Sequence, residues 1–279
     1  MTDDNRAMTG ADAGGHSPAG PTDSDRGRTA SDLLATWRRL PTFVLRAALT
    51  IDGIALLLYA LAVGFMLKAP LLFFLFDLDA EGNPPSWWFG VQQLLVALVF
   101  LLLASRIFAS DERLRPLRPL FVTAGIGFGI ISLDEIGELH ETISKLIEKS
   151  VKIRGFERRL TKSLHVTHHL RGGGLWIPLY AIIGIVALAL LAPYFVKAYK
   201  LWRREVLTVV IGFAVFVASA ALLQVVGYFF PIRSLAHRVY VFVEQGLKMG
   251  GVTIVLWGVA QVLSSGLERV TTLVAGDGD

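Results

Sequence analysis

The sequence predicts an all-α fold, a polytopic bundle of transmembrane helices, on two observations. Hydrophobic residues make up 53% of the 279-residue chain, and the mean hydropathy is positive at +0.56. Apolar runs long enough to cross a bilayer recur along the chain, since about 20 helical residues span the hydrocarbon layer. The loops between them are short and polar, which leaves no room for a second folded domain of any size.

The apolar runs predict six spans. Each run is about 20 to 25 residues long, which suits helices that cross the membrane with some tilt. The expected spans are residues 43–67, 87–108, 119–138, 175–195, 206–230 and 239–262.

The segments outside the membrane domain, which we expect at 43–265, have a different composition. Residues 1–30 are rich in Asp, Gly, Thr, Ala and Ser without apolar periodicity, so a disordered tail is expected. Residues 31–42 combine a serine N-cap with an apolar stripe, which predicts an amphipathic helix along the headgroups. A second amphipathic segment is expected in the loop 141–171, and a tail at 266–279.

Composition excludes several classes of site and partner. The chain has no cysteine, so disulfides, thiolate metal sites, iron–sulfur clusters and cysteine nucleophiles are excluded. The pI of about 9.4 does not indicate nucleic-acid binding, because Lys and Arg in membrane proteins usually lie in loops against anionic headgroups. Membrane lipids are therefore the expected partners, and no nucleic acid is.

Six spans place the N-terminus, the C-terminus and the loops around residues 110–118 and 197–205 on one side, here called the near side. Polar residues gather instead in the leaflet of the opposite, far side, whereas the near halves of the spans are apolar with Asp52 as the clearest exception. A catalytic or binding cavity needs access from one side only, whereas a transporter needs a polar route to both. Short, arginine-rich near loops favour a cytoplasmic near side in a bacterial cytoplasmic membrane.

An acidic stretch begins inside the third span. On a helix, Asp134, Glu138 and Glu141 fall within about 60° of one another and Glu135 flanks them. Such carboxylates repel unless a metal ion, shared protons or a facing cation neutralises them. The alternative is that the span ends before these acids and leaves them in a solvated turn, although the apolar stretch 120–133 alone is short for a span.

Histidines lie next to this stretch by topology. His165 and His169 share a helix face at the i, i+4 spacing by which two imidazoles hold one zinc or similar ion, and His140 follows the acids on the same side. Contact with lipid headgroups is the alternative role for a histidine pair in a basic loop. The sequence thus predicts a divalent metal site for zinc, iron or manganese. Its expected ligands are His140, His165, His169, Glu138 and Glu141.

The last span carries Glu244 and Lys248 one helical turn apart. At this spacing the two side chains can pair with each other, which is the least costly way to keep both inside a membrane. Glu244 is also a candidate acid–base group, since an ionisable residue inside a span is by default a functional hypothesis.

Several short motifs in spans three to six resemble a family. They are Ser132-Leu133-Asp134-Glu135, Leu139-His140-Glu141, Trp176-Ile177-Pro178 and Val243-Glu244-Gln245 with Gly250. This set resembles a group of bacterial multi-pass membrane proteins of undefined function, with an acidic stretch ending in His-Glu, a Trp-Pro pair opening a span and a paired-acid last span. The resemblance implies further acids where this chain has Gln245 and Lys248, so ligand sets that need those acids do not carry over.

The residue inventory is also similar to that of seven-span zinc hydrolases of the alkaline ceramidase and adiponectin-receptor type. Those proteins build a metal site in one leaflet from three histidines, an acid and a serine, and Ser132, Asp134, His140, His165 and His169 supply the same groups here. The order along the chain differs, because their histidine pair lies in the last helix. The comparison is therefore one of chemistry and not of fold.

The leading hypothesis is a metal-dependent hydrolase in the membrane that acts on a small or lipid-like substrate. Its expected catalytic groups are Asp134, Glu135, Glu138 and Glu244. Two alternatives remain open: a proton- or cation-coupled transporter with Asp52 as its inner station, and a non-catalytic scaffold whose charges only pair internally.

Overall fold

The computed structural model is almost entirely helical in the residues that it describes. These are residues 23–65, 70–80, 82–107, 112, 114–137, 139, 142, 176–227, 229–231 and 234–276. No strand occurs among them, which confirms the predicted all-α class.

The described helices and helical turns span most of the chain. In chain order they are α1 (Asp23–Phe65), α2 (Pro70–Phe76), α3 (Pro84–Leu102), the π-helical turn η1 (Leu103–Ile107), the 3-10 turn η2 (Arg115–Leu117), α5 (Arg118–Gly137), α8 (Trp176–Leu201), α9 (Arg203–Val217), the π-helical segment η3 (Ala218–Leu223), α10 (Gln224–Gly227) and α11 (Leu235–Gly276).

Six segments of the described chain are long and apolar enough to cross a membrane, which confirms the predicted multi-pass bundle. They are Ala35–Phe65, Pro84–Ser105, Arg115–Gly137, Tyr180–Leu201, Arg203–Leu223 and Leu235–Glu268. Each overlaps one of the spans expected from the sequence, and the largest differences lie at the start of the first span and at the end of the fifth.

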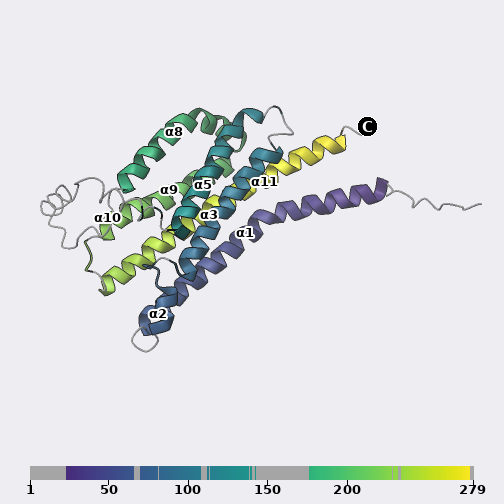
Figure 1. Ribbon diagram of the computed structural model, residues 1–279. Helices are drawn as coiled ribbons and strands as arrows, with labels where there is room; N and C mark the ends of the chain where they lie inside the picture. The colour runs from purple at the N-terminus through teal and green to yellow at the C-terminus, as the bar shows by residue number, and fades with distance from the viewer. Residues whose placement is uncertain are drawn as a thin grey trace, which may run out of the picture.

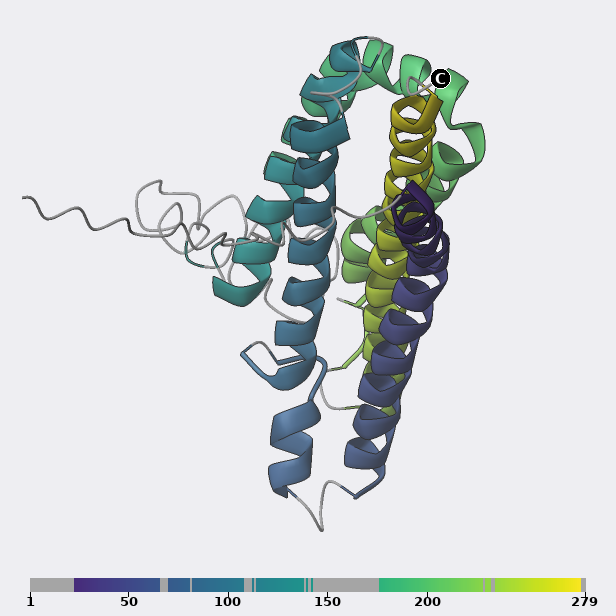
Figure 2. The same cartoon turned by 90° about the vertical axis from the view of Figure 1, so that its right-hand side faces the viewer.

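Helix α11 is the centre of the bundle. It packs against α1, α3 and α9, and Val252, Val255 and Val259 on it are completely buried. Figures 1 and 2 show α1 running beside α11, while α3 and α5 pair with each other on a second side. Helix α8 lies at the periphery, where most of its apolar side chains are exposed.

Glycines allow α9 and α11 to approach closely. A Cβ atom placed on Gly212 would lie 2.7 Å from the backbone N of Val255, and one on Gly251 would lie 2.7 Å from the backbone N of Phe216. Small residues drive this kind of packing in membranes, because lipid tails provide no hydrophobic force between helices. The contact fixes the position of α9, and of η3 after it, against α11.

Aromatic side chains fill the bundle from its near end to its middle. Phe121 at the near end contacts both Phe100 and Trp202, and Phe128 at the middle contacts Phe100 and Phe213. Ring centroids in these pairs are 5.8 to 6.5 Å apart, within the range of favourable aromatic contacts. The described near half of the bundle is therefore packed with apolar groups.

Two expectations about the chain ends are corrected. Helix α1 begins at Asp23 and runs through Pro41 into the first span, so part of the expected tail 1–30 and all of the segment 31–42 belong to one helix; residues 1–22 lie outside the described residues. Likewise α11 continues to Gly276, into the expected tail 266–279.

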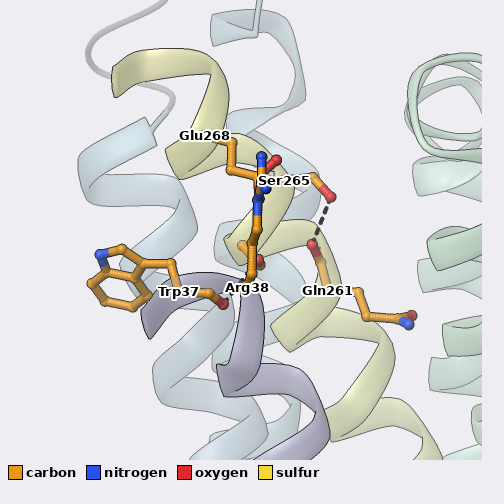
Figure 3. Close-up of polar contacts among 6 residues, drawn as sticks. Trp37, Arg38, Gln261, Ser265 and Glu268 are labelled. Carbon is orange, nitrogen blue, oxygen red and sulfur yellow. Dashed lines mark hydrogen bonds and ion pairs between the residues drawn. The ribbon is translucent and has the colours of Figure 1, made fainter. Parts of the chain in front are cut away.

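The physical reason is a contact between the two helices beyond the apolar runs. The Ser264 Oγ donates to the carbonyl of Trp37 at 3.0 Å, and the Arg38 Nε lies 2.7 Å from the Glu268 Oε1. Figure 3 shows Trp37, Arg38 and Glu268 where α1 and α11 meet. Each helix thus packs against the other beyond the end of its apolar run.

The close approach of α9 and α11 yields the first prediction. Gly251→Ala should lower the free energy of unfolding by about 1–3 kcal/mol, because its methyl group must push the backbone of α9 away. The adjacent Gly250→Ala is the matched control, since a Cβ there meets nothing within 4 Å. Unfolding by SDS titration in mixed micelles measures both, and equal stabilities of the two variants would contradict the packing described.

Candidate functional site

A buried carboxylate joins three helices at the bundle centre. The Asp52 Oδ1 on α1 accepts hydrogen bonds from the Trp88 Nε1 at 2.8 Å and the Gln92 Nε2 at 2.7 Å, both on α3. The Asp52 Oδ2 accepts from the Thr253 Oγ1 on α11 at 2.7 Å. The Gln92 Nε2 also lies 3.0 Å from the Thr253 Oγ1, which closes the network. Every oxygen of this carboxylate therefore has a partner within the protein.

This position corrects the expectation that Asp52 lies in the near half of its span. Because α1 is helical from Asp23, the spanning segment begins at Ala35, and Asp52 falls near its middle. Its partner Thr253 is likewise near the middle of the span Leu235–Glu268. Asp52 and its partners therefore lie at or beyond the middle of the membrane. The apolar, aromatic half of the bundle lies between them and the near side.

Two adjacent glutamines on α3 complete the centre. Gln92 and Gln93 have no exposed surface, and among the described residues no hydrogen-bond partner lies near the Gln92 Oε1 or near either side-chain polar atom of Gln93. Gln93 lies one turn from Phe89, which contacts Phe216 on α9, so it is on the face of α3 that points to the bundle interior.

The acidic stretch of the third span is helical at its start. Asp134 is inside α5 and only 7% exposed, and the Tyr180 hydroxyl on α8 donates a hydrogen bond to it. This contradicts the alternative in which the span ends before Asp134 and leaves it in a solvated turn. Glu135, the next residue, is half-buried and also has an interaction partner.

Glu244 is paired, as its spacing to Lys248 predicted. The Lys248 Nζ lies 2.7 Å from the Glu244 Oε1, and the side chains are 15% and 8% exposed. The pair lies in the far half of α11, in the part of the helix next to the π-helical segment η3. π-Helical turns widen a helix and often occur at functional sites.

The structure leaves the predicted metal ligands untested. Glu138, His140, Glu141, His165 and His169 all lie outside the described residues. Within the described ranges, no group of three or more His, Asp or Glu side chains is close enough to hold a metal ion. Asp134 and Glu244, two of the expected catalytic groups, contact different partners on different helices.

The described polar groups therefore follow one direction. The Asp52 network and Gln93 lie near the middle, while the Glu244–Lys248 and Asp134–Tyr180 pairs lie in the far half. Sequence reasoning located Asp134, Glu244 and Lys248 in the far leaflet but placed Asp52 in the near half and missed the roles of Trp88 and Thr253. No local pattern marks a lone Thr in an apolar helix as a carboxylate ligand.

Comparison with known proteins identifies a family. Residues 44–262 match the family described as Domain of unknown function (DUF8692), and because the match covers most of the chain, the protein belongs to this family. No curated protein and no solved structure matches the chain significantly.

The buried ion pair gives the second prediction. Glu244→Gln or Lys248→Met alone should each lower the free energy of unfolding by about 3 kcal/mol, because the remaining charge is left unpaired inside the membrane. The double variant should recover most of that loss, since neither charge remains. SDS titration measures the stability of the two single variants and of the double variant. A double variant no more stable than the less stable single variant would show that the pair does not act as a unit.

Proposed function

We propose that this member of the DUF8692 family is a membrane-embedded enzyme that acts on a lipid-like substrate from the far side, as a metal-dependent hydrolase. One observation supports the proposal most directly. All buried charged side chains within the described spans lie at the middle or in the far half, while apolar and aromatic residues occupy the near half. A site with access from one side fits catalysis better than passage across the membrane.

The catalytic groups of this proposal are the acids at the far helix ends. Asp134, held by the Tyr180 hydroxyl, and Glu135 lie at the end of α5, which leads directly to Glu138. These carboxylates would take and return the proton of an attacking water, the ordinary work of a general base. Glu244, which pairs with Lys248, would act on a second group of the substrate.

The proposed metal ligands have suitable donor chemistry. Imidazole and carboxylate groups suit zinc, iron and manganese, and His140, His165, His169, Glu138 and Glu141 supply both types. A bound divalent ion would supply Lewis-acid chemistry and would relieve the repulsion among the stacked acids. The exposed apolar surface of α8, next to Tyr180, gives a lipid-like substrate a path to these groups from within the bilayer.

A proton-coupled transporter remains the second candidate because of Asp52. A buried acid at mid-membrane is a common proton station in transporters, and Asp52 has that position. Against this role, the described near half of the spans has no buried charged side chain between Asp52 and the near end, and the buried Ser264 hydroxyl there is already bonded to the carbonyl of Trp37.

We also propose that the protein lies in a bacterial cytoplasmic membrane with the near side in the cytoplasm. The near-side ends of the spans carry Arg38, Arg39, Arg115, Arg118, Arg203 and Arg204, which favour the cytoplasmic face.

Cysteine labelling tests this topology on a chain that has no native cysteine. Arg39→Cys and Arg115→Cys should react with an impermeant thiol reagent only after cells are opened, whereas Asp79→Cys, in the exposed loop between α2 and α3, should react in intact cells. Reaction of positions 79 and 115 from the same side would overturn the arrangement of the spans, and reaction of 39 and 115 but not 79 in intact cells would reverse the orientation.

The same substitution, Asp to Asn, at two positions distinguishes the enzyme hypothesis from the transporter hypothesis. Asp134→Asn should reduce activity by at least about 100-fold, as expected for loss of an acid–base group, whereas Asp52→Asn should leave it within a few-fold. The assay is rescue of any phenotype of a deletion strain, with protein level in the membrane as the control. Rescue by Asp134→Asn, or its loss in Asp52→Asn at normal expression, would count against the enzyme.

Metal analysis tests the hydrolase separately. The protein purified without chelators should contain about one equivalent of zinc, iron or manganese, and His140→Ala should reduce that content by at least about tenfold. Glu112→Ala, an exposed acid in a near-side loop, is the control. If the wild-type protein holds no metal under these conditions, the proposal of a metal-dependent hydrolase is wrong.

A further inference from the structure

The centre of the bundle contains polar atoms that the described protein groups do not satisfy. The Gln92 Oε1, the Gln93 Oε1 and the Gln93 Nε2 are fully buried on two adjacent residues of α3. Buried polar atoms without partners are rare in proteins, and each calls for an explanation such as bound water or an ion. Three such atoms on two consecutive residues, one of which is bonded to the Asp52 carboxylate, therefore indicate small polar ligands at this level of the bundle.

The orientation of Gln92 is fixed by its neighbours. Its Nε2 faces the Asp52 Oδ1 at 2.7 Å, and an amide oxygen there would be repelled by the carboxylate. The Gln92 Oε1 must therefore be the atom directed away from Asp52. Together with Gln93, the centre offers two carbonyl acceptors and one NH2 group with two donors.

These acceptors and donors determine which ligand can satisfy them. A metal cation would bind the two carbonyl oxygens but would leave the NH2 group of Gln93 without an acceptor. Water donates two hydrogen bonds and accepts two, so water bound at each glutamine satisfies these atoms. A larger ligand is disfavoured because neither glutamine has exposed surface.

The two oxygens of Asp52 differ in what they can do. Oδ1 receives hydrogens from Trp88 and Gln92, whose nitrogens are donors only, so it cannot carry a proton without losing a bond. Oδ2 faces the Thr253 hydroxyl, which can either donate or accept. When Oδ2 holds a proton, Thr253 accepts it and turns its own hydrogen to a backbone carbonyl one turn earlier in α11, a bond that helical Thr commonly makes.

We propose that Asp52 is a reversible proton-binding site, with Oδ2 as the protonated atom, Thr253 as its hydrogen-bond switch, and water held by Gln92 and Gln93 as its route of proton exchange. The proposal stands apart from the hydrolysis proposed above, because it involves none of the same residues. The other titratable groups in the spanning parts of α1 and α11 that are at least half-buried are Tyr59, His237, Arg238, Tyr240, Glu244, Lys248 and Glu268, and α3 has none. Their titration must be separated from that of Asp52 by the variants.

Infrared difference spectroscopy of the purified full-length protein in nanodiscs tests the proton site. Between pH about 4 and 9, the range over which buried carboxyls titrate, wild-type protein should show a protonated-carboxyl band that Asp52→Asn lacks and Glu244→Gln retains. Thr253→Val, which keeps the side-chain shape, should move the frequency of that band because the Oδ2 partner is gone. Absence of an Asp52-dependent band, or a band unmoved in Thr253→Val, would overturn the proton site and its switch.

Transfer into D2O tests the water. The shift of the Asp52 band should be at least tenfold slower in Gln93→Leu than in wild type, because leucine has a similar size but cannot hold water. Gln261→Leu, on the near part of α11, is the matched control and should exchange at the wild-type rate. Equal exchange rates in wild type and Gln93→Leu would overturn the proposed route, as would equal slowing by the control.

Discussion

The structure depends on a single constraint: inside the hydrocarbon layer, a polar group must find its partner within the protein. Helix α11 meets this constraint because it is surrounded by α1, α3 and α9 and exposes little of its middle to lipid. Asp52 bonds to α3 and α11 at once, so three helices that are far apart in the sequence share one carboxylate. A polar junction of this kind specifies the register of the helices, which apolar packing alone leaves loosely defined.

The two ends of the bundle follow from this centre. On the near side, aromatic rings pack between α3, α5 and α9 and need no polar partners. On the far side, the buried acids have a neutralising or hydrogen-bonding neighbour, as Glu244 has in Lys248 and Asp134 has in Tyr180. The buried acids of the described spans each have such a partner, and none of these acids lies in the near half.

Sequence reasoning succeeded where a property depends on neighbours along the chain. The spans were predictable from apolar length, and the Glu244–Lys248 pair from its i, i+4 spacing. Asp134 was placed inside the span because residues 120–133 are too few to cross the membrane alone. The helix ends were not predictable, since α1 and α11 continue beyond their apolar runs through contacts such as that of Arg38 with Glu268. Thr253 and Trp88 were missed because their role depends on the distant Asp52, and the histidines of the predicted metal site lie outside the described residues.

The positions of the two kinds of acid separate their roles. Asp52 has three hydrogen-bond donors fixed on rigid helices, so a change in its protonation alters the contacts between α1, α3 and α11 themselves. Asp134 and Glu244 each have one principal partner near a helix end, where a substrate group can take the place of that partner at small cost to the fold. Chemistry on a bound molecule requires acids of the second kind, because a catalytic group must exchange its partner during each cycle. The far-side acids therefore suit the proposed reaction, whereas the protonation of Asp52 suits a role in how α1, α3 and α11 pack together.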